Sequence, residues 1–300
     1  MSRPLRVGTR GSALARAQAE AVARLLPVPW ELVSVVSAGD RRGPGDPGPG
    51  RGIFVGALQE ALRAGEVDLC VHSAKDVPPE SAEGLVLAAY PPREDARDAL
   101  VGRALADLPR GAVVGTGSPR RASQLRALRP DLRVRALAGN VDSRLARLAA
   151  GEFDAAVLAR AGLLRLGRDA EARQVLEPEE MVPAAGQGAL VLEVRRDDAA
   201  AAAAAAALND ATTAFCVGVE RAVQGALDGG CTVPCGVLCR AARGGRGWEA
   251  LAALAGTGHF VLRVTATVPG APTGDTAEHL TAAVLHALGA ARAPAGGGGR

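Results

Sequence analysis

The first third of the chain alternates short apolar strands with helical segments, and this order constrains the fold more than any other feature. LRVGT (5–9), WELVSVVSA (30–38) and DLCVHSA (68–74) have the length and composition of strands. Between them, a segment opened by Ser12 and a second one at 55–67 carry apolar residues at helical spacing. Strands that alternate with helices in this way predict βαβ units and a parallel sheet.

The middle third repeats the pattern, and the last third departs from it. Strands are expected at 111–117, 132–139 and from 153, and helices at 118–129 and 141–152. From about residue 212 the order becomes a helix, a hairpin at 251–268 and a helix at 275–292, before a tail at 293–300 that we expect to be disordered. The sequence therefore predicts two similar α/β lobes followed by a smaller α+β unit.

The length and composition of the chain indicate several domains, and its cysteines indicate a reducing compartment. The chain has 300 residues, which suits two or three cores, and with 2% aromatic residues those cores must consist of Ala, Val and Leu. The N-terminus lacks the apolar segment of a signal peptide, and no stretch of about 20 residues is apolar enough to span a bilayer. The five cysteines are odd in number and not spaced as a disulfide framework, so we expect a cytoplasmic protein.

Positive charge is concentrated in the middle third. Residues 93–173 carry 16 arginines against 10 acidic residues. A nucleic acid or a small polyanion could account for this excess. Phe153 is the one aromatic residue there, so base stacking is poorly supported, and arginine is suited to carboxylates, which it binds through two hydrogen bonds.

Two strand-to-helix junctions have the features of anion sites. GTGSPRR (115–121) places hydroxyls and two arginines at a helix N-terminus, where free N–H groups attract anions. TRGS (9–12) is the equivalent junction in the first third. An ordinary capped helix with solvated arginines is the alternative interpretation. If both junctions bind anions, a ligand lies between the two lobes.

Lys75 is the only lysine in the chain, and Asp76 follows it at the end of a predicted strand. Ligand sites of open α/β sheets lie at such carboxyl ends. A plain surface ion pair, which usually contributes ~0–1 kcal/mol, is the alternative. We expect His72, two residues earlier in the apolar strand, to be a packed residue and not a catalyst.

The segment GGCTVPCGVLC (229–239) places Cys231 at a glycine turn. An exposed thiol there is a candidate nucleophile or attachment point. Spacings of four in a strand-like segment do not favour a metal site, and Cys235 and Cys239 could be small buried apolar residues. The Gly- and Pro-rich segment 39–52 is either a surface connection or a lid over a site.

Nine motifs in order give the sequence a specific resemblance. They are TRGSALARAQ, GRGIFVGAL, DLCVHSAKDVP, REDARDALV, VGTGSPRRASQL, GNVDSRL, FDAAVLARAGLLRLG, PAAGQGAL and ERAVQGALDGGCTVPCG. Together they resemble the porphobilinogen deaminase (hydroxymethylbilane synthase) family from about residue 5 to 240.

The resemblance implies a transferase of tetrapyrrole biosynthesis. Such enzymes join four porphobilinogen molecules head to tail, with loss of ammonia, to give hydroxymethylbilane. They prime the chain on a covalent dipyrromethane cofactor, whose thioether matches Cys231, and their catalytic aspartate matches Asp76. A carboxylate about 4 Å from the cation left by ammonia loss would stabilise it by ~4 kcal/mol at an effective dielectric constant of about 20.

The resemblance also implies the remaining site residues and the fold. The cofactor-binding residues would be Ser73, Lys75, Thr116, Ser118, Arg120, Arg121 and Arg144. The substrate-binding residues would be Arg10, Ser12, Gln18, Arg165 and Gln187. The implied fold class is α/β and α+β: two periplasmic-binding-protein-like α/β lobes with a double interlobe crossover, plus a small C-terminal α+β domain. The expected boundaries are 1–92 with 187–208, then 93–186, then 209–292.

The sequence departs from the family pattern at a few positions. Ala138 stands where arginine is usual, so a carboxylate contact is missing or comes from Arg135. Gly56 and Leu164 stand where lysine is frequent. Lysine at position 75 would suit a crowded carboxylate cluster in which a guanidinium fork would not fit.

Two other functions remain as alternatives. One is a non-catalytic two-lobed binding module for a polycarboxylate, and the other is a nucleic-acid-binding protein that uses the basic middle third. The preferred interpretation has porphobilinogen as its small-molecule substrate, no metal, no nucleic-acid or membrane partner, and a monomer.

Overall fold

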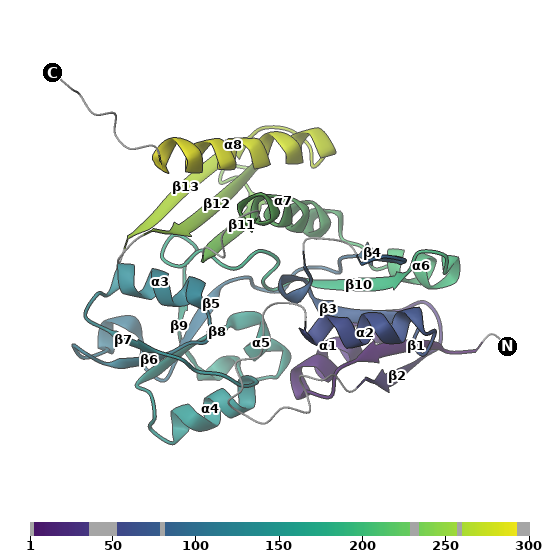
Figure 1. Cartoon of the computed structure of the whole chain (residues 1–300), viewed down its shortest axis with the longest axis horizontal. Coiled ribbons are helices and arrows are strands. Elements are labelled where there is room, and N and C mark those ends of the chain that lie inside the picture. Colours follow the sequence, from purple (N-terminus) through teal and green to yellow (C-terminus); the bar gives the residue numbers. More distant parts are fainter. Residues whose placement is uncertain (1–2, 36–52, 79–81, 229–233, 257–259, 293–300) are drawn as a thin grey trace.

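Three β-sheets organise the part of the chain that the structure, a computed structural model, describes: residues 3–35, 53–78, 82–228, 234–256 and 260–292. Two of these sheets are five-stranded and form separate lobes, and the third lies above them with two long helices (Figure 1). The predicted architecture of two α/β lobes and a smaller α+β unit is confirmed.

The sheet of the first lobe, sheet A, contains four strands from residues 5–89 and one strand, at 190–195, that comes much later in the sequence. Its strands, in spatial order, are β2 (Trp30–Ser34), β1 (Leu5–Thr9), β3 (Leu69–Ser73), β10 (Leu190–Arg195) and β4 (Leu85–Ala89). β1 is parallel to β2 and β3, whereas β10 is antiparallel to β3 and β4. The prediction of a parallel sheet is therefore wrong for β10, because the chain returns to this sheet from the other lobe and not through a crossover helix.

Sheet B has the same arrangement. Its strands, in spatial order, are β7 (Arg133–Arg135), β6 (Val113–Gly115), β8 (Ala155–Ala159), β5 (Asp98–Val101) and β9 (Ala172–Leu176). β6 is parallel to β7 and β8, and β5 is antiparallel to β8 and β9. In each sheet the antiparallel strand is the first one after a crossing between lobes. This is the double crossover, and β4 and β5, which flank the first crossing, were not predicted from the sequence.

Helices cover the sheets, and the periodicity predicts all of the described α-helices except those at 160–165 and 199–206. They are α1 (Ala13–Ala23), α2 (Ile53–Arg63), α3 (Pro119–Leu128), α4 (Val141–Ala149), α5 (Arg160–Arg165), α6 (Ala199–Ala206), α7 (Ala211–Asp228) and α8 (Gly274–Arg292), with short 3₁₀ turns η1 (Ala74–Asp76), η2 (Leu105–Asp107) and η3 (Asp169–Glu171). Ser12 and Ser118 begin α1 and α3 as predicted, since each side chain accepts a hydrogen bond from a backbone N–H three residues later.

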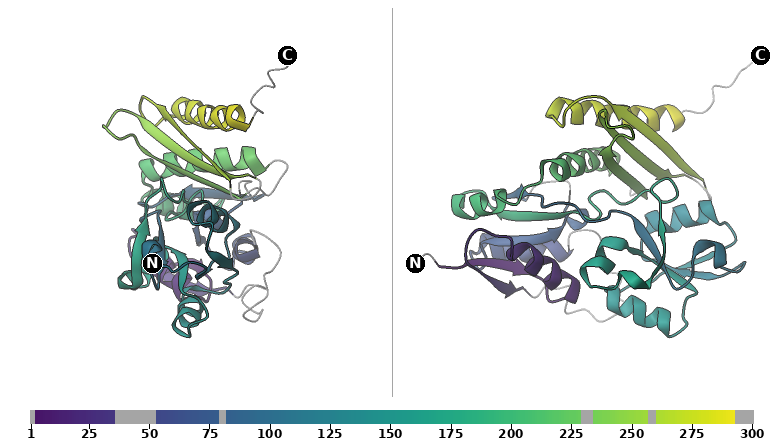
Figure 2. Two further views of the ribbon diagram at one scale, coloured as in Figure 1. Left: turned by 90° about the vertical axis from the view of Figure 1, so that its left-hand side faces the viewer. Right: turned by 180° about the vertical axis from the view of Figure 1, so that it is seen from behind.

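The third unit consists of sheet C and two helices. The antiparallel strands β11 (Cys235–Ala241), β12 (Trp248–Ala255) and β13 (Val261–Val268) form the predicted hairpin and one further strand. Two further views show α7 and α8 beside this sheet and above both lobes (Figure 2). The strands of each sheet assign these segments of the chain to one of the three units. The exact domain boundaries, predicted near 92, 186 and 208, stay predictions.

The crossing segments fit tightly between the units. A Cβ atom on Gly188 would lie 2.4 Å from the carbonyl oxygen of Glu94 on the opposite crossing segment, and the φ of Gly188 is +85°. A Cβ atom on Gly186, which has a φ of +71°, would lie 3.0 Å from the backbone nitrogen of Lys75. Because only glycine fits such positions, the GQG sequence fixes how closely the second crossing approaches β3 and the first crossing.

No single helix in the described part of the chain is long and apolar enough to cross a bilayer. The helices α6 and α7 together have the length and composition of such a span, but they are bent by 106° relative to each other.

Candidate active site

The turn after β3 carries the two charged residues singled out in the sequence. β3 is buried from Leu69 to His72, and η1 follows directly with Ala74 buried, Lys75 partly exposed and Asp76 exposed. Asp76 therefore lies at the carboxyl end of a central parallel strand, as predicted. His72 is packed, with Nε2 2.9 Å from Oε2 of buried Glu193.

The N-terminus of α3 is the second part of the site. Thr116 Oγ1 accepts a hydrogen bond from the Ser118 N–H (3.1 Å), and Ser118 Oγ accepts one from the Arg121 N–H (3.4 Å). Both hydroxyls accept within the loop, which leaves their hydrogens able to donate to an anion. The two arginines that follow are buried, each with 5% of its surface exposed, and not solvated as the alternative interpretation required.

A buried carboxylate holds these two arginines, and sequence analysis missed it. Asp98, at the start of β5, has no exposed surface. Its Oδ2 accepts from Arg120 Nη2 (2.7 Å), and its Oδ1 accepts from Arg121 Nε (2.9 Å) and from Gln187 Nε2 (2.9 Å). Burial alone would raise the pKa of Asp98, but the charges of Arg120 and Arg121, with the hydrogen bonds from Arg120 and Gln187, outweigh it and lower the pKa to about 2.

Lys75 lies in the field of the same groups. Burial is the largest influence on its pKa and lowers it; Asp76 and Asp98 raise it, and Arg121 and Arg120 lower it. The resulting pKa of about 8 means that the ammonium is charged at neutral pH and loses its proton a little above it. The three cations around two carboxylates leave an excess of positive charge at this place.

Arg144 adds a fourth cation. It is partly buried on α4, and burial together with the charge of Arg121 lowers its pKa to about 10, while Asp76 raises it. Among the described residues, Nε of Arg144 and Nε of Arg120 are buried and have no hydrogen-bond partner. Buried donors without partners are costly, so both nitrogens are suited to an acceptor supplied by a ligand.

These residues fit a polycarboxylate such as dipyrromethane. Four cationic side chains lie with two acidic ones, the Nε–H donors of two of these arginines have no partner among the described residues, and two hydroxyls lie at a helix N-terminus. Of the predicted cofactor set, Lys75, Arg120, Arg121 and Arg144 are thus brought together electrostatically, and Ser73 directly precedes the η1 turn.

The residues predicted to face substrate differ in exposure and in their contacts. Ser12 caps α1 and Arg10 is partly buried beside it, whereas Gln18 is buried at 6% exposure. Arg165 Nη2 donates to the Gly188 carbonyl (2.6 Å), and burial lowers the pKa of Arg165 to about 10.

Gln187 lies inside the network and is 1% exposed. Besides Asp98, its Nε2 donates to the Ala96 carbonyl (2.7 Å), so both amide hydrogens are used internally. Its contact with substrate stays a prediction, while its bond to Asp98 is a feature that the sequence did not indicate.

The cysteines divide into buried, partly exposed and undescribed ones. Cys231 and the segment 39–52 lie outside the described residues, so the attachment site and the lid stay predictions. Cys239 is buried, as expected for a small apolar residue, and Cys235 is partly exposed. Within the described ranges no cluster of three His, Cys, Asp or Glu residues could hold a metal ion.

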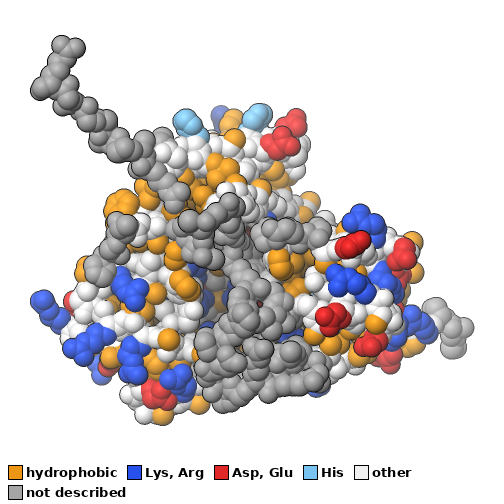
Figure 3. All heavy atoms as spheres, in the orientation of Figure 1, with side chains coloured by type: hydrophobic (Ala, Val, Ile, Leu, Met, Phe, Trp, Pro, Cys, Tyr) orange, Lys and Arg blue, Asp and Glu red, His pale blue; other side chains and the backbone are white. Residues whose placement is uncertain are grey.

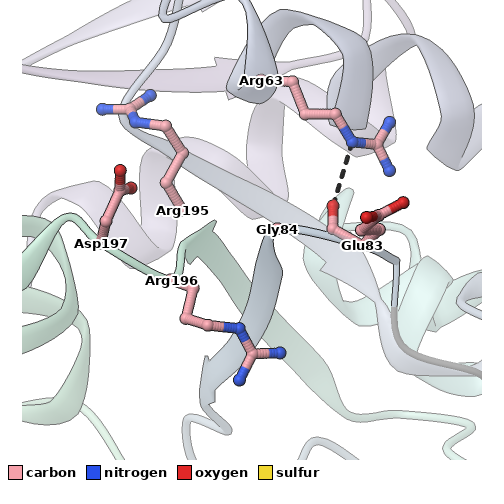
Figure 4. A pocket seen from close by; sticks show the side chains of 6 residues that line it. All are labelled: Arg63, Glu83, Gly84, Arg195, Arg196 and Asp197. Atoms are coloured by element: carbon pink, nitrogen blue, oxygen red, sulfur yellow. Dashed lines mark hydrogen bonds between the residues drawn. The ribbon is translucent and has the colours of Figure 1, made fainter.

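A hollow of about 560 Å³ lies elsewhere on the molecule. Its lining residues, shown in Figure 4, are Arg63, Glu83, Gly84, Arg195, Arg196 and Asp197. β10 runs antiparallel to β3, so Arg195 lies at the edge of sheet A opposite Asp76. None of the predicted site residues lines this hollow.

The basic character of the middle third is visible on the surface. On the face in Figure 3, Lys and Arg side chains gather on the lobe of sheet B at the left, whereas the lobe of sheet A at the right carries acidic and basic side chains together. The arginine excess of residues 93–173 is thus partly buried at the site and partly exposed on this lobe.

Comparisons with known proteins find relatives in sequence and similar folds among solved structures. Residues 5–203 match the family model described as "Porphobilinogen deaminase, dipyromethane cofactor binding domain", which spans every strand of sheets A and B. The porphobilinogen deaminases of Nocardia farcinica and Acidothermus cellulolyticus are both 49% identical, over 78% of this chain and over 70% and 74% of their own. Among solved structures, an ancestral cationic amino acid solute binding protein is similar with a TM-score of 0.42 and 18% identity, over 68% of this chain and 86% of that one.

Proposed function

The chain belongs to the porphobilinogen deaminase family, and we propose that its reaction depends on Asp76. It is a transferase of tetrapyrrole biosynthesis that joins four porphobilinogen molecules head to tail, with loss of ammonia, to give hydroxymethylbilane. The reaction is primed on a dipyrromethane cofactor, and the matching family model is that of the cofactor-binding domain. The alternative of a non-catalytic binding module is not supported by these relatives.

The convergence of four cations around Asp76 and Asp98 carries the proposal for the site. Each pyrrole of the substrate brings an acetate and a propionate, so a growing chain accumulates carboxylates. Arg120 Nε and Arg144 Nε, which lack partners inside the described protein, and the ammonium of Lys75 would bind these carboxylates. The remaining cofactor contacts would come from hydroxyl and guanidinium donors of Ser73, Thr116, Ser118 and Arg121.

The cofactor supplies a nucleophilic pyrrole carbon when it is bound, and we propose that its thioether is to Cys231. Asp76 then has two tasks. Its exposed carboxylate stabilises the positive charge that develops on the substrate methylene as the carbon–nitrogen bond breaks and ammonia leaves. It also accepts the proton released from the pyrrole carbon when the new carbon–carbon bond forms.

The neighbours of Asp76 prepare it for these tasks. Lys75 and Arg144 interact electrostatically with its carboxylate, so the negative charge that is to face the developing cation lies beside two positively charged side chains. On the substrate side we propose Arg10, Ser12, Gln18, Arg165 and Gln187. In this set Gln187 acts through Asp98, because its amide hydrogens are bound within the protein.

We propose that the protein acts in the cytoplasm as a monomer, without a metal, membrane or nucleic-acid partner. The cysteine pattern supports this location, and the carboxylate-oriented arginines support a small-molecule ligand in place of a nucleic acid.

Replacing Asp76 tests the assignment. We expect Asp76→Asn and Asp76→Ala to lower turnover of porphobilinogen by at least ~10²-fold, which is usual for a preorganised electrostatic group. Turnover is compared at equal cofactor loading, measured by intact mass. Asp197→Asn, an exposed acid at the opposite edge of sheet A, is the control and should stay within twofold of wild type. A loss below tenfold in both Asp76 variants would place the catalytic carboxylate elsewhere.

A further inference from the structure

One face of α7 supports the turn that carries Lys75 and Asp76. Val217, which has no exposed surface, packs in one cluster with Ala74 and Val77, the residues on either side of this charged pair. Arg221 lies one turn further along α7, on the same face. The helix of the third unit is therefore in direct contact with the backbone around Asp76.

Arg221 holds the chain immediately after Asp76. Its Nη1 donates to the Val77 carbonyl (2.9 Å), and its Nη2 donates to the Pro78 carbonyl (2.6 Å). A charged guanidinium that binds two successive carbonyls fixes both the position and the direction of that segment. The two carbonyls belong to residues one and two positions beyond Asp76, so a movement here is transmitted to its side chain.

The neighbouring residue Glu220 completes the contact from the other side. It has no exposed surface, and its Oε2 accepts a hydrogen bond from the Gly186 N–H (2.7 Å). Gly186 approaches Lys75 so closely that a Cβ atom on Gly186 would lie 3.0 Å from the backbone nitrogen of Lys75. Two adjacent residues of α7 thus hold the η1 turn, one directly and one through the second crossing segment.

We propose that Arg221 is a positioning residue, which sets the place of Asp76 relative to the primer by tying the η1 turn to α7. The helix continues without interruption from Arg221 to Asp228, a rise of about 10 Å, and Asp228 stands three residues before Cys231 in the sequence. The inference rests on the proposed roles of Asp76 and Cys231. Arg221 acts through the backbone and through α7, and it takes no part in proton transfer.

Arg221→Met removes both carbonyl contacts while keeping an unbranched side chain. We expect kcat for porphobilinogen to fall at least tenfold, because small misplacements of a reacting group are costly, while KM changes less than twofold. Cofactor loading, measured by intact mass, should equal that of wild type. Arg221→Lys keeps one donor and should recover part of the lost kcat.

Arg129→Met is the matched control. Arg129 also binds two backbone carbonyls, those of Leu105 (2.8 Å) and Leu108 (3.2 Å), and it lies at the C-terminal end of α3, whose N-terminal end belongs to the site; it pairs with Asp131 as well. It should lower the melting temperature as Arg221→Met does and leave kcat within twofold of wild type.

Two results would overturn the proposal. One is a kcat of Arg221→Met that stays within twofold of wild type while its melting temperature falls, as expected for Arg129→Met, which would make Arg221 a structural brace alone. The other is a rise in KM without a change in kcat, which would make it a ligand contact. If Asp76→Asn retains activity, the proposed function fails independently of either outcome.

Discussion

Asp98→Asn tests whether the buried carboxylate holds the arginines of the site. The substitution keeps the shape of the side chain but removes the negative charge from a group without exposed surface. Its pKa of about 2, against an ordinary value of 3.8, corresponds to ~2 kcal/mol of preference for the ionised form in the folded state. That stabilisation is present above pH 3.8 and is lost as the pH falls through about 2.

The larger cost comes from the partners that remain. Arg120 and Arg121 are 5% exposed and would keep their charges without a buried counter-charge. Breaking a buried ion pair in this way costs about 3–5 kcal/mol, which at about 1.6 °C per kcal/mol for a chain of this length predicts a fall in melting temperature of about 5–8 °C. A bound polycarboxylate would restore part of the negative charge, so the fall should be smaller in cofactor-loaded protein.

The assay is thermal unfolding of four proteins near pH 7. They are the wild type and Asp98→Asn, each with its cofactor, and the same pair in a Cys231→Ser background, which we expect to lack it. We predict that Asp98→Asn lowers the melting temperature more in the cofactor-free pair than in the cofactor-loaded pair. A fall below about 2 °C in the unloaded pair would refute the reasoning, because it would mean that Arg120 and Arg121 do not depend on Asp98. Equal falls in both pairs would refute the role of these arginines in binding carboxylates.

Two other groups give further predictions. Cofactor loading of cofactor-free protein should fall above pH 8, because free Lys75 loses its proton there while a bound cofactor carboxylate keeps it charged; loading that is constant from pH 7 to 9.5 would contradict this. Lys75→Arg should remove that pH dependence and lower loading at pH 7, and unchanged activity and loading would refute our steric explanation for lysine. Glu220→Gln should reduce the free energy of unfolding, measured with denaturant, by about 3–5 kcal/mol, because the fully buried carboxylate of Glu220 forms an ion pair with Arg93 (Oε1 to Nη1, 2.6 Å). Glu152→Gln, in an exposed pair, should change it by less than about 1 kcal/mol, and similar losses in both would contradict this account.

Local patterns were sufficient for most elements and for one half of the site. Ser118 with Pro119 predicted the start of α3, and the apolar run before Ser73 predicted β3, because capping and strand patterns are written within a few residues. The position of Asp76 at a strand end follows from the same local signal. The strands β4 and β5 were missed since the patterns around the first crossing, at 85–101, are short and interrupted by prolines and charges.

The other half of the site depends on contacts between distant residues. Asp98 stands 22 and 23 residues before its arginine partners and 89 before Gln187, so no spacing rule connects them. Arg221 binds carbonyls 143 and 144 residues away. The antiparallel insertion of β10 likewise depends on the second crossing, which the family resemblance implied and the periodicity did not. An acid in an apolar stretch such as RDALV is a signal that a buried partner exists, although it does not identify that partner.

The central claim is that the chain is primed by a covalent dipyrromethane and extends it with porphobilinogen. The most direct test is the intact mass of the purified protein beside its Cys231→Ser variant, before and after addition of porphobilinogen. The account predicts a wild-type mass greater than that of the sequence by one dipyrrole unit, further pyrrole additions with substrate, and no dipyrrole on the variant. A wild-type mass equal to that of the sequence, unchanged by porphobilinogen, would contradict it.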